Sequence, residues 1–255
     1  VDVVRLLLAR KEIQINQAKE DGATPLYIAN FNDHTNIVQL LLKQPNINIG
    51  KMDDSGDTLL ISATRKGHVE VVRLLLAMPD IDVNQAQKRS GNTPLYMACQ
   101  NGHVDVVRLL LARKDILINQ AGRNGETPFF RACRFGHVEV VRLLLDMPGI
   151  NINQLNSKEN KATSLYIACQ NGHADVVKLL LTHKDIDVNI TLNTNGATPL
   201  YIACGMGHAG VVQLLLARED IDVNQVANDG TTPLQIAQLE KQTEIVALLS
   251  KSKKK

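Results

Sequence analysis

The sequence contains no tryptophan, and aromatic residues make up only 3% of its 255 positions. A local cluster of aromatic side chains would therefore be unusual in this chain. No apolar stretch approaches the ~18 residues that a membrane-spanning helix requires. The apolar runs that are present, such as VVRLLLA, are short and amphipathic. We therefore expect no membrane span.

Neither sign of charge dominates the sequence. It has 28 Lys and Arg against 26 Asp and Glu, a formal net charge of +2. Four of the lysines lie in the tail at 251–255, and without them the chain is slightly acidic. Nucleic-acid-binding domains are normally strongly basic, so nucleic acid is not the expected partner. The tail itself is either a nuclear-import or acidic-partner patch or a frayed, solubilising end, which is the more common state of charged termini.

An internal repeat organises the chain. The segment GNTPLYMACQNGHVDVVRLLLARKDILINQ, which starts at Gly91, recurs with small changes. Its threonine returns at intervals of 34 to 36 residues, and a fixed period of this length is typical of stacked-repeat proteins. We predict one array over residues 1–250, made of a half repeat at 1–16 and seven full repeats. The anchor threonines are Thr24, Thr58, Thr93, Thr127, Thr163, Thr198 and Thr232.

Each repeat predicts two short helices. Thr93 suits the N-cap of the first helix, and Pro94 suits its first position, where no amide hydrogen is needed. Small apolar residues follow as far as a turn at Gly102 and His103, and valines and leucines at helical spacing then mark a second helix from Val104. The chain next extends toward a glycine-containing turn, a hairpin-like signal. Two such helices cannot bury their apolar faces alone, so neighbouring repeats must stack.

The repeats resemble the ankyrin family. The family pattern is a Gly before T-P-L-H-x-A, a G-H turn, an I/V-V-x-L-L helix and a V-N ending, and it recurs in register from Val1 to about Leu249. The resemblance implies an all-α repeat solenoid of stacked helix–turn–helix pairs with hairpin-like fingers. It also implies a protein partner, bound through the concave groove and the fingers. The family's His after T-P-L is aromatic here at Tyr27, Tyr96, Phe130, Tyr166 and Tyr201.

Departures from the common repeat predict local differences. Repeat 5 has Ser164 in place of the proline, Lys161 in place of the turn glycine, and the longest finger, 153–163. We therefore expect repeat 5 to open more readily than repeats 3 and 4. Repeat 1 ends in Gly50 where other repeats end in Asn, and we attribute this to a shared tolerance of left-handed backbone. The anchor threonine lies 26 residues before this ending in repeats 1 to 6, so insertions fall in the fingers, a face that often binds partners.

The two ends of the array differ. The N-terminal half repeat begins with VDVVRLLL, which leaves an apolar helix face without a partner helix. We expect a longer parent array whose preceding residues would raise the melting temperature. The last repeat is predicted to be a polar cap. Its polar substitutions are Gln235, Gln238, Glu240, Lys241 and Gln242.

Histidine and cysteine recur at fixed repeat positions and so should form lines, with neighbours ~10 Å apart. That spacing is too wide for two histidines to share a zinc ion or for two cysteines to form a disulfide. We expect turn-forming histidines, buried and reduced cysteines, and no metal or cofactor. Free thiols fit a reducing, intracellular compartment, the cytoplasm or the nucleus. The residues are His34, His68, His103, His137, His173 and His208, and Cys99, Cys133, Cys169 and Cys204.

Repeat 4 diverges most, with TPFFRACRFGH where repeat 3 has TPLYMACQNGH. Arg131 replaces a residue that is apolar in most repeats, and Arg134 and Phe135 occupy the helix end that the resemblance places at the groove. Arginine and large aromatic residues are enriched in binding hot spots. An alternative is that Phe129 and Phe130 only repack the core and that Arg131 extends to solvent. The predicted partner-binding residues are Asp57, Arg65, Lys66, Arg89, Arg123, Glu126, Arg131, Arg134 and Phe135.

These features favour a monomeric, non-catalytic module that binds a protein with an acidic and apolar surface. No Ser-His-Asp set, phosphate-binding loop or paired-carboxylate site is present in the sequence pattern. An alternative is a targeting or scaffolding segment of a larger enzyme or effector whose catalytic domain lies outside this chain. The mass of the native full-length protein would separate the two.

Overall fold

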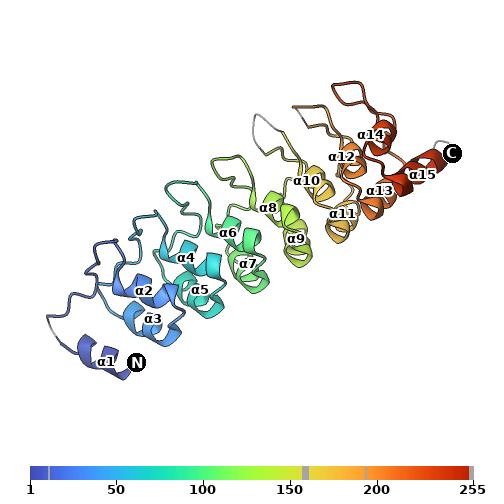
Figure 1. The fold of residues 1–255 in the computed structure, drawn as a ribbon. Coiled ribbons are helices and arrows are strands. Elements are labelled where there is room, and N and C mark those ends of the chain that lie inside the picture. Colours follow the sequence, from blue (N-terminus) through green and yellow to red (C-terminus); the bar gives the residue numbers. More distant parts are fainter. Residues whose placement is uncertain (11, 157–160, 193, 253–255) are drawn as a thin grey trace. The chain divides into compact units, whose positions relative to one another are not determined.

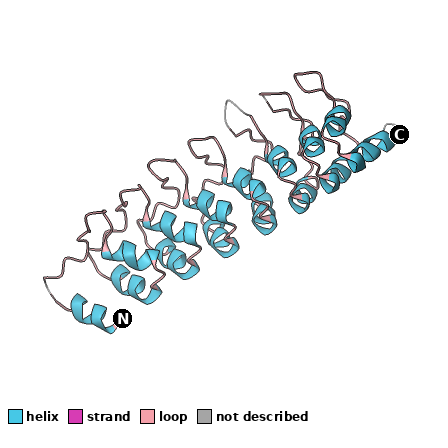
Figure 2. Cartoon of the chain, in the orientation of Figure 1, coloured by secondary structure: helices cyan, strands magenta, loops and turns pink. Residues whose placement is uncertain are grey.

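The computed structural model describes residues 1–10, 12–156, 161–192 and 194–252. In these residues it contains fifteen α-helices and no strand, as Figures 1 and 2 show. The predicted all-α fold of helix pairs is confirmed. The chain divides into two compact units, Val1–Arg123 and Asn124–Lys255.

The first unit stacks the first helices of its repeats on one another and does the same with the second helices. Helix α4 packs between α2 and α6, and α5 packs between α3 and α7. Figure 1 shows the loops between repeats emerging on the side of α2, α4 and α6. The helices are α1 (Asp2–Leu8), α2 (Pro25–Phe31), α3 (Thr35–Leu42), α4 (Leu59–Lys66), α5 (Val69–Leu76), α6 (Pro94–Asn101) and α7 (Val104–Leu111).

The second unit has the same organisation. Helices α10 and α12 each pack between first helices of neighbouring repeats, and α11 and α13 pack between second helices. The last pair, α14 and α15, closes the unit against α12 and α13. The helices are α8 (Pro128–Arg134), α9 (Val138–Leu145), α10 (Ser164–Gln170), α11 (Ala174–Leu180), α12 (Pro199–Gly205), α13 (Ala209–Leu216), α14 (Pro233–Leu239) and α15 (Thr243–Ser252).

A capping threonine starts each first helix, as predicted. The hydroxyl of Thr93 accepts a hydrogen bond from the backbone N–H of Tyr96 at 3.1 Å, and the other six anchor threonines accept the equivalent bond. Such a cap stabilises a helix by about 1 kcal/mol. It fixes where each seven- or eight-residue helix begins, and hence which side chains face the neighbouring repeat.

The core consists of the small residues of the first helices and the valines and leucines of the second helices. In repeat 3, Ala98, Cys99, Val106, Val107 and Leu110 are all fully buried. The other full repeats bury most of the equivalent positions, except that Ile37 and Val246 are partly buried and Gln238 is exposed. Helix α1 of the half repeat buries none of its residues. The apolar face of α1 is accordingly exposed, with Leu6 at 72%.

Histidines and glycines form the junctions between successive repeats. The ring of His103 hydrogen-bonds the backbone carbonyl of Arg65 in the preceding repeat at 2.9 Å, and His173 and His208 make the equivalent contact. A β-carbon on Gly67 would lie 2.6 Å from the His103 ring, and Gly67 also has a left-handed φ of 76°. The predicted turn role of histidine is confirmed for these residues, and each one also links two repeats.

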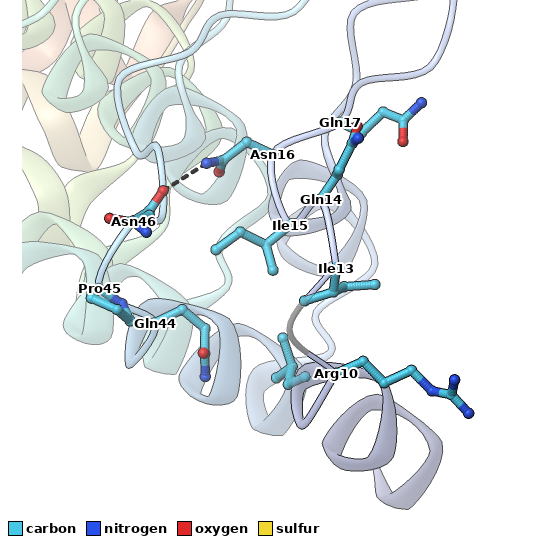
Figure 3. Close-up of a pocket in the computed structure, with 10 residues that line it drawn as sticks. Arg10, Ile13, Gln14, Ile15, Asn16, Gln17, Gln44, Pro45 and Asn46 are labelled. Carbon is cyan, nitrogen blue, oxygen red and sulfur yellow. Dashed lines mark hydrogen bonds between the residues drawn. The ribbon is translucent and has the colours of Figure 1, made fainter.

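Asparagine side chains form a second line of links. Asn84 donates from Nδ2 to the carbonyl of Asp115 at 2.7 Å and accepts at Oδ1 from the N–H of Leu117 at 2.9 Å. Figure 3 shows the first such link, from Asn16 to the carbonyl of Asn46 at 2.6 Å. Asn153 and Asn189 repeat it in the second unit.

The attribution of Gly50 to a shared tolerance of left-handed backbone was wrong. Neither Gly50 nor the asparagines of the other repeats have a positive φ. Asparagine is present because its amide satisfies two backbone groups of the next repeat. Gly50 has no side chain and cannot make this link.

The fingers, defined as the loops between each V-N ending and the next anchor threonine, are short hairpins. Asp53 N–H donates to the carbonyl of Asp57 at 3.1 Å, and Gln87 N–H donates to that of Asn92 at 2.9 Å. Neighbouring fingers also bond each other, since Lys88 N–H donates to the carbonyl of Gly56 at 3.3 Å. The finger of repeat 5 includes residues 157–160, which lie outside the described residues.

Charged residues on several second helices form exposed i,i+3 pairs. Asp2–Arg5, Glu70–Arg73 and Glu139–Arg142 lie within 3.3–3.5 Å of each other, and all six side chains are about half exposed or more. Such pairs contribute little to stability, about 0.2–0.5 kcal/mol each. They mark the outer, solvated face of each unit.

The four cysteines are free and buried, as predicted. Burial raises the pKa of Cys133 and Cys169 far above the usual thiol range and that of Cys204 to about 12. We predict that a thiol reagent counts four thiols in denaturant without reductant and almost none in the native protein over the same time. A count of two or zero in denaturant would show that the cysteines pair.

Repeat 5 carries backbone strain that the sequence alone did not reveal. Lys161 has a left-handed φ of 51°, where the equivalent residues Gly125 and Gly196 have φ of 75° and 68°. A side chain in this region costs about 1–2 kcal/mol. We predict that Lys161→Gly raises the free energy of unfolding by about 0.5–1 kcal/mol and slows hydrogen exchange in α10. Lys184→Gly, in an exposed turn with ordinary backbone, should bring no gain, and equal exchange in α10 and α8 of the parent protein would contradict the strain argument.

Gly50 offers a second stability test. Asn84 bonds the carbonyl of Asp115 and the N–H of Leu117 in the next repeat. By the repeat alignment, an asparagine at position 50 would bond the carbonyl of Asp80 and the N–H of Asp82. We predict that Gly50→Asn restores the link and stabilises the first unit by about 1 kcal/mol in urea unfolding. Gly50→Ala restrains the unfolded chain equally without supplying an amide, so it is the matched control. Equal gains for both variants would exclude the proposed hydrogen bonds.

Candidate partner-binding surface

Glu126 is a buried carboxylate at the centre of the divergent fourth repeat. It directly precedes the capping threonine of α8 and is 5% exposed. Its oxygens accept from Arg131 at 2.7 Å, from Arg134 at 2.9 Å and from Asn124 Nδ2 at 2.7 Å. An unpaired carboxylate would be very costly at this depth. The three donors satisfy Glu126, which in turn fixes the direction of both guanidinium groups.

Asp57 plays the equivalent part in the second repeat. It directly precedes the capping threonine of α4 and is 1% exposed. It accepts from Arg65 Nη2 at 2.7 Å and from Gln87 Nε2 at 2.6 Å. Asp57 and Glu126 are therefore too buried to present their charge to a partner, and their effect on a surface is to orient the arginines.

Phe135 lies at the C-terminal end of α8 and is 46% exposed. The guanidinium carbon of Arg131 lies over its ring, 4.8 Å from the ring centroid, and the ring also stacks on His137 with centroids 6.2 Å apart. Arg131 does not extend to solvent, because it turns inward to Glu126 and its side chain is only 14% exposed. Phe129 and Phe130 are buried at 1% and 2%, so these two rings do repack the core.

A second exposed ring was missed by the sequence reasoning. Phe31, at the end of α2, is 44% exposed, and the Nζ of Lys66 lies over it, 3.2 Å from the ring centroid. Lys66 also donates to the carbonyl of Phe31 at 3.1 Å. The available signal was its place in the repeat, because Phe31 aligns with Arg65 and Arg134 seven residues after the anchor threonine.

Arg89 and Arg123 hold the fingers of the first unit together. Arg89 Nη2 donates to the carbonyl of Asp54 at 3.1 Å, and Arg123 Nη2 donates to that of Lys88 at 2.8 Å. Both side chains remain exposed. The structure thus brings Asp57 and Arg65 into direct contact and places Lys66 on the same helix end, while Arg89 and Arg123 lie on neighbouring fingers.

The family comparison agrees with this architecture. A family model of ankyrin repeats (3 copies) matches the chain in five overlapping stretches, residues 1–87, 48–120, 80–156, 114–191 and 165–255. The chain belongs to the ankyrin repeat family. No curated protein matches it. Ankyrin repeats are generally protein-interaction modules, which directs attention to surfaces rather than to enclosed sites.

The main cleft in the described part of these ankyrin repeats is open to solvent and has few ionisable lining residues. This cleft, of about 600 Å³, lies between residues 13–17 and 44–46. Figure 3 shows the residues that line it, among them Arg10. Across the described residues no group of three or more His, Cys, Asp or Glu could hold a metal ion. A search of the same residues finds no helix long and apolar enough to cross a membrane.

Tyr27 joins two neighbouring ankyrin repeats through its hydroxyl group. The hydroxyl of Tyr27 donates to Asp53 of the next finger at 2.7 Å. Burial, followed by this bond, raises the pKa of Tyr27 to about 12. Burial alone would raise the pKa of Asp53, but hydrogen bonds from Ser55, Tyr27 and the backbone outweigh it and lower that pKa. The pKa shift of Tyr27 thus follows from its burial and its bond to the next finger, whereas that of Asp53 comes mainly from hydrogen bonds within its own finger.

Proposed function

We propose that this chain is a non-catalytic protein-binding module whose main contact residues are Arg134 and Phe135 at the end of α8, with the less exposed Arg131 packed over the Phe135 ring. The observation that carries the proposal is a half-exposed ring under the guanidinium group of Arg131, together with the buried carboxylate of Glu126 that orients both Arg131 and Arg134. Rigid aromatic and arginine side chains of this kind dominate the energy of protein interfaces. In the first unit, the cations Arg65, Lys66, Arg89 and Arg123 are further proposed contact residues.

The charges suggest what the partner presents. Two arginines contact the single carboxylate of Glu126, so this cluster carries a net positive charge, and the Phe135 ring adds an apolar contact. A partner surface that is acidic and apolar complements both. Oriented guanidinium groups favour carboxylates because the planar fork can bond both oxygens.

The non-catalytic part of the proposal rests on how the reactive residue types are used. The histidines and asparagines named above bond the backbone of neighbouring repeats, and the four cysteines are buried. These are structural roles that recur with the repeat. The function that we propose is therefore partner binding, through the fingers and the C-terminal ends of the first helices.

The test is capture of a partner from the native cell, followed by a double substitution. We predict that Arg134→Ala with Phe135→Ala weakens binding of the captured protein by more than ~2 kcal/mol, about 30-fold. The free energy of unfolding should change little, because Glu126 keeps Arg131 and Asn124 and because Phe135 is half exposed.

Arg142→Ala is the matched control, since Arg142 lies in the same unit and is 55% exposed on the outer face of α9. It should leave binding unchanged. Full affinity of the double variant would place the binding surface elsewhere. A captured partner that is nucleic acid, with an affinity that falls steeply as salt rises, would refute the protein-binding proposal.

A further inference from the structure

The arrangement around Glu126 occurs twice in the chain, once in each unit. An acid directly before the anchor threonine is found in repeats 2 and 4, as Asp57 and Glu126, and an arginine seven residues after that threonine is found in the same two repeats, as Arg65 and Arg134. The common fold does not require either residue. The equivalents of the acid elsewhere are Ala23, Asn92, Ala162, Ala197 and Thr231, and those of the arginine are Phe31, Gln100, Gln170, Gly205 and Leu239.

The two acid–arginine pairs also agree in geometry. The acid side chains are only 2% and 7% exposed, whereas Arg65 and Arg134 are 40% and 43% exposed, and the pairs are 2.7 and 2.9 Å long. A side-chain amide also donates a hydrogen bond to each carboxylate, from Gln87 in the first unit and from Asn124 in the second. At each place the carboxylate is internal, and a fixed guanidinium group faces outward.

Each pair has an exposed phenylalanine and a second cation beside it. In the first unit Lys66, adjacent to Arg65, covers the ring of Phe31, and in the second unit Arg131 covers the ring of Phe135. The two rings have almost the same exposure, 44% and 46%. The nearby carboxylate of Asp33 lies 4.0 Å from the His68 ring, and no ion pair joins it to Arg65 or Lys66 among the described contacts.

We propose that Phe31, Arg65 and Lys66 form a second subsite with the same chemistry as Arg131, Arg134 and Phe135. Each subsite takes an acidic side chain of the partner on the arginine and an adjacent apolar side chain on the ring. The occupant is an acidic peptide segment with interspersed aromatic or aliphatic residues. Asp57 and Glu126 are positioning residues for the two arginines. This inference rests on the proposed function and adds the second subsite, the partner chemistry and the role of the buried acids.

The experiment uses the full chain, labelled with ¹⁵N, and a short synthetic probe, the acetylated and amidated peptide Asp-Leu-Asp-Phe-Asp. We expect the peptide to shift amide resonances around Phe31 and Arg65 and, separately, around Arg134 and Phe135. Arg65→Ala should abolish only the first set of shifts, and Arg134→Ala only the second. The same peptide with lysine in place of aspartate should shift neither set.

Matched control variants exist in each unit. Arg73→Ala and Arg142→Ala remove exposed outer-face arginines and should leave both sets of shifts intact. Shifts confined to the Arg134 region would overturn the second subsite but leave the proposed function standing. Absence of shifts at both places, or shifts that neither arginine variant removes, would overturn the second subsite and count against the proposed function as well.

A charge-neutral substitution tests the positioning role. Glu126→Gln makes the cluster more positive, so a purely electrostatic site should bind the acidic peptide more tightly. If Glu126 orients the arginines, binding at this subsite should instead weaken by about fivefold or more. Glu126→Asp, which is the acid used in the first unit, should stay within about twofold of the parent. Unchanged or tighter binding by Glu126→Gln would overturn the positioning role, and thermal melting of each variant confirms that it is folded during the titration.

Discussion

Helices of seven or eight residues are not stable alone in water, because the cost of nucleation exceeds the gain from so few hydrogen bonds. Every described helix of a full repeat has that length, apart from α15, which has ten residues. Each helix is stable only when it is buried against the next repeat. All repeats therefore share the shape that this packing requires. Thr93 and its equivalents fix the helix start, while His103 and Asn84 satisfy backbone groups of a neighbour. The sequence pattern thus repeats once per helix pair, whereas the stability of each pair comes from its contacts with the neighbouring repeats.

Much of this could be predicted from the sequence because the repeated residues act through local rules. Thr93 and Pro94 define a helix start, Cys99 lies on a buried face, and Gly67 needs a left-handed backbone. Each rule involves residues a few positions apart. The histidine turn was also predictable, although the contact of His103 with the repeat before it involves a partner 38 residues away.

The remaining features depend on contacts between repeats, which a single repeat pattern does not show. Gly50 was explained by its backbone, whereas the side-chain amide of its equivalents forms the link. Arg89 and Arg123 were selected for charge, yet each also holds the preceding finger. Phe31 shares its repeat position with Arg65 and Arg134, but its contact with Lys66 of the next repeat follows only from the stacking.

The junction between Gly67 and His103 bears on how such a chain can change over generations. A side chain at this glycine would displace a histidine that belongs to the following repeat, so a point substitution in one repeat damages another. Gain or loss of a whole repeat by unequal recombination has a different effect. After such an event, the glycine of one repeat again faces the histidine of the next repeat, so the contact between them is kept. The equivalent contacts Gly136–His173 and Gly172–His208 show that these junctions are interchangeable. Changes in length are therefore better tolerated than changes of single junction residues, and new binding surfaces can arise by copying a repeat that already carries one.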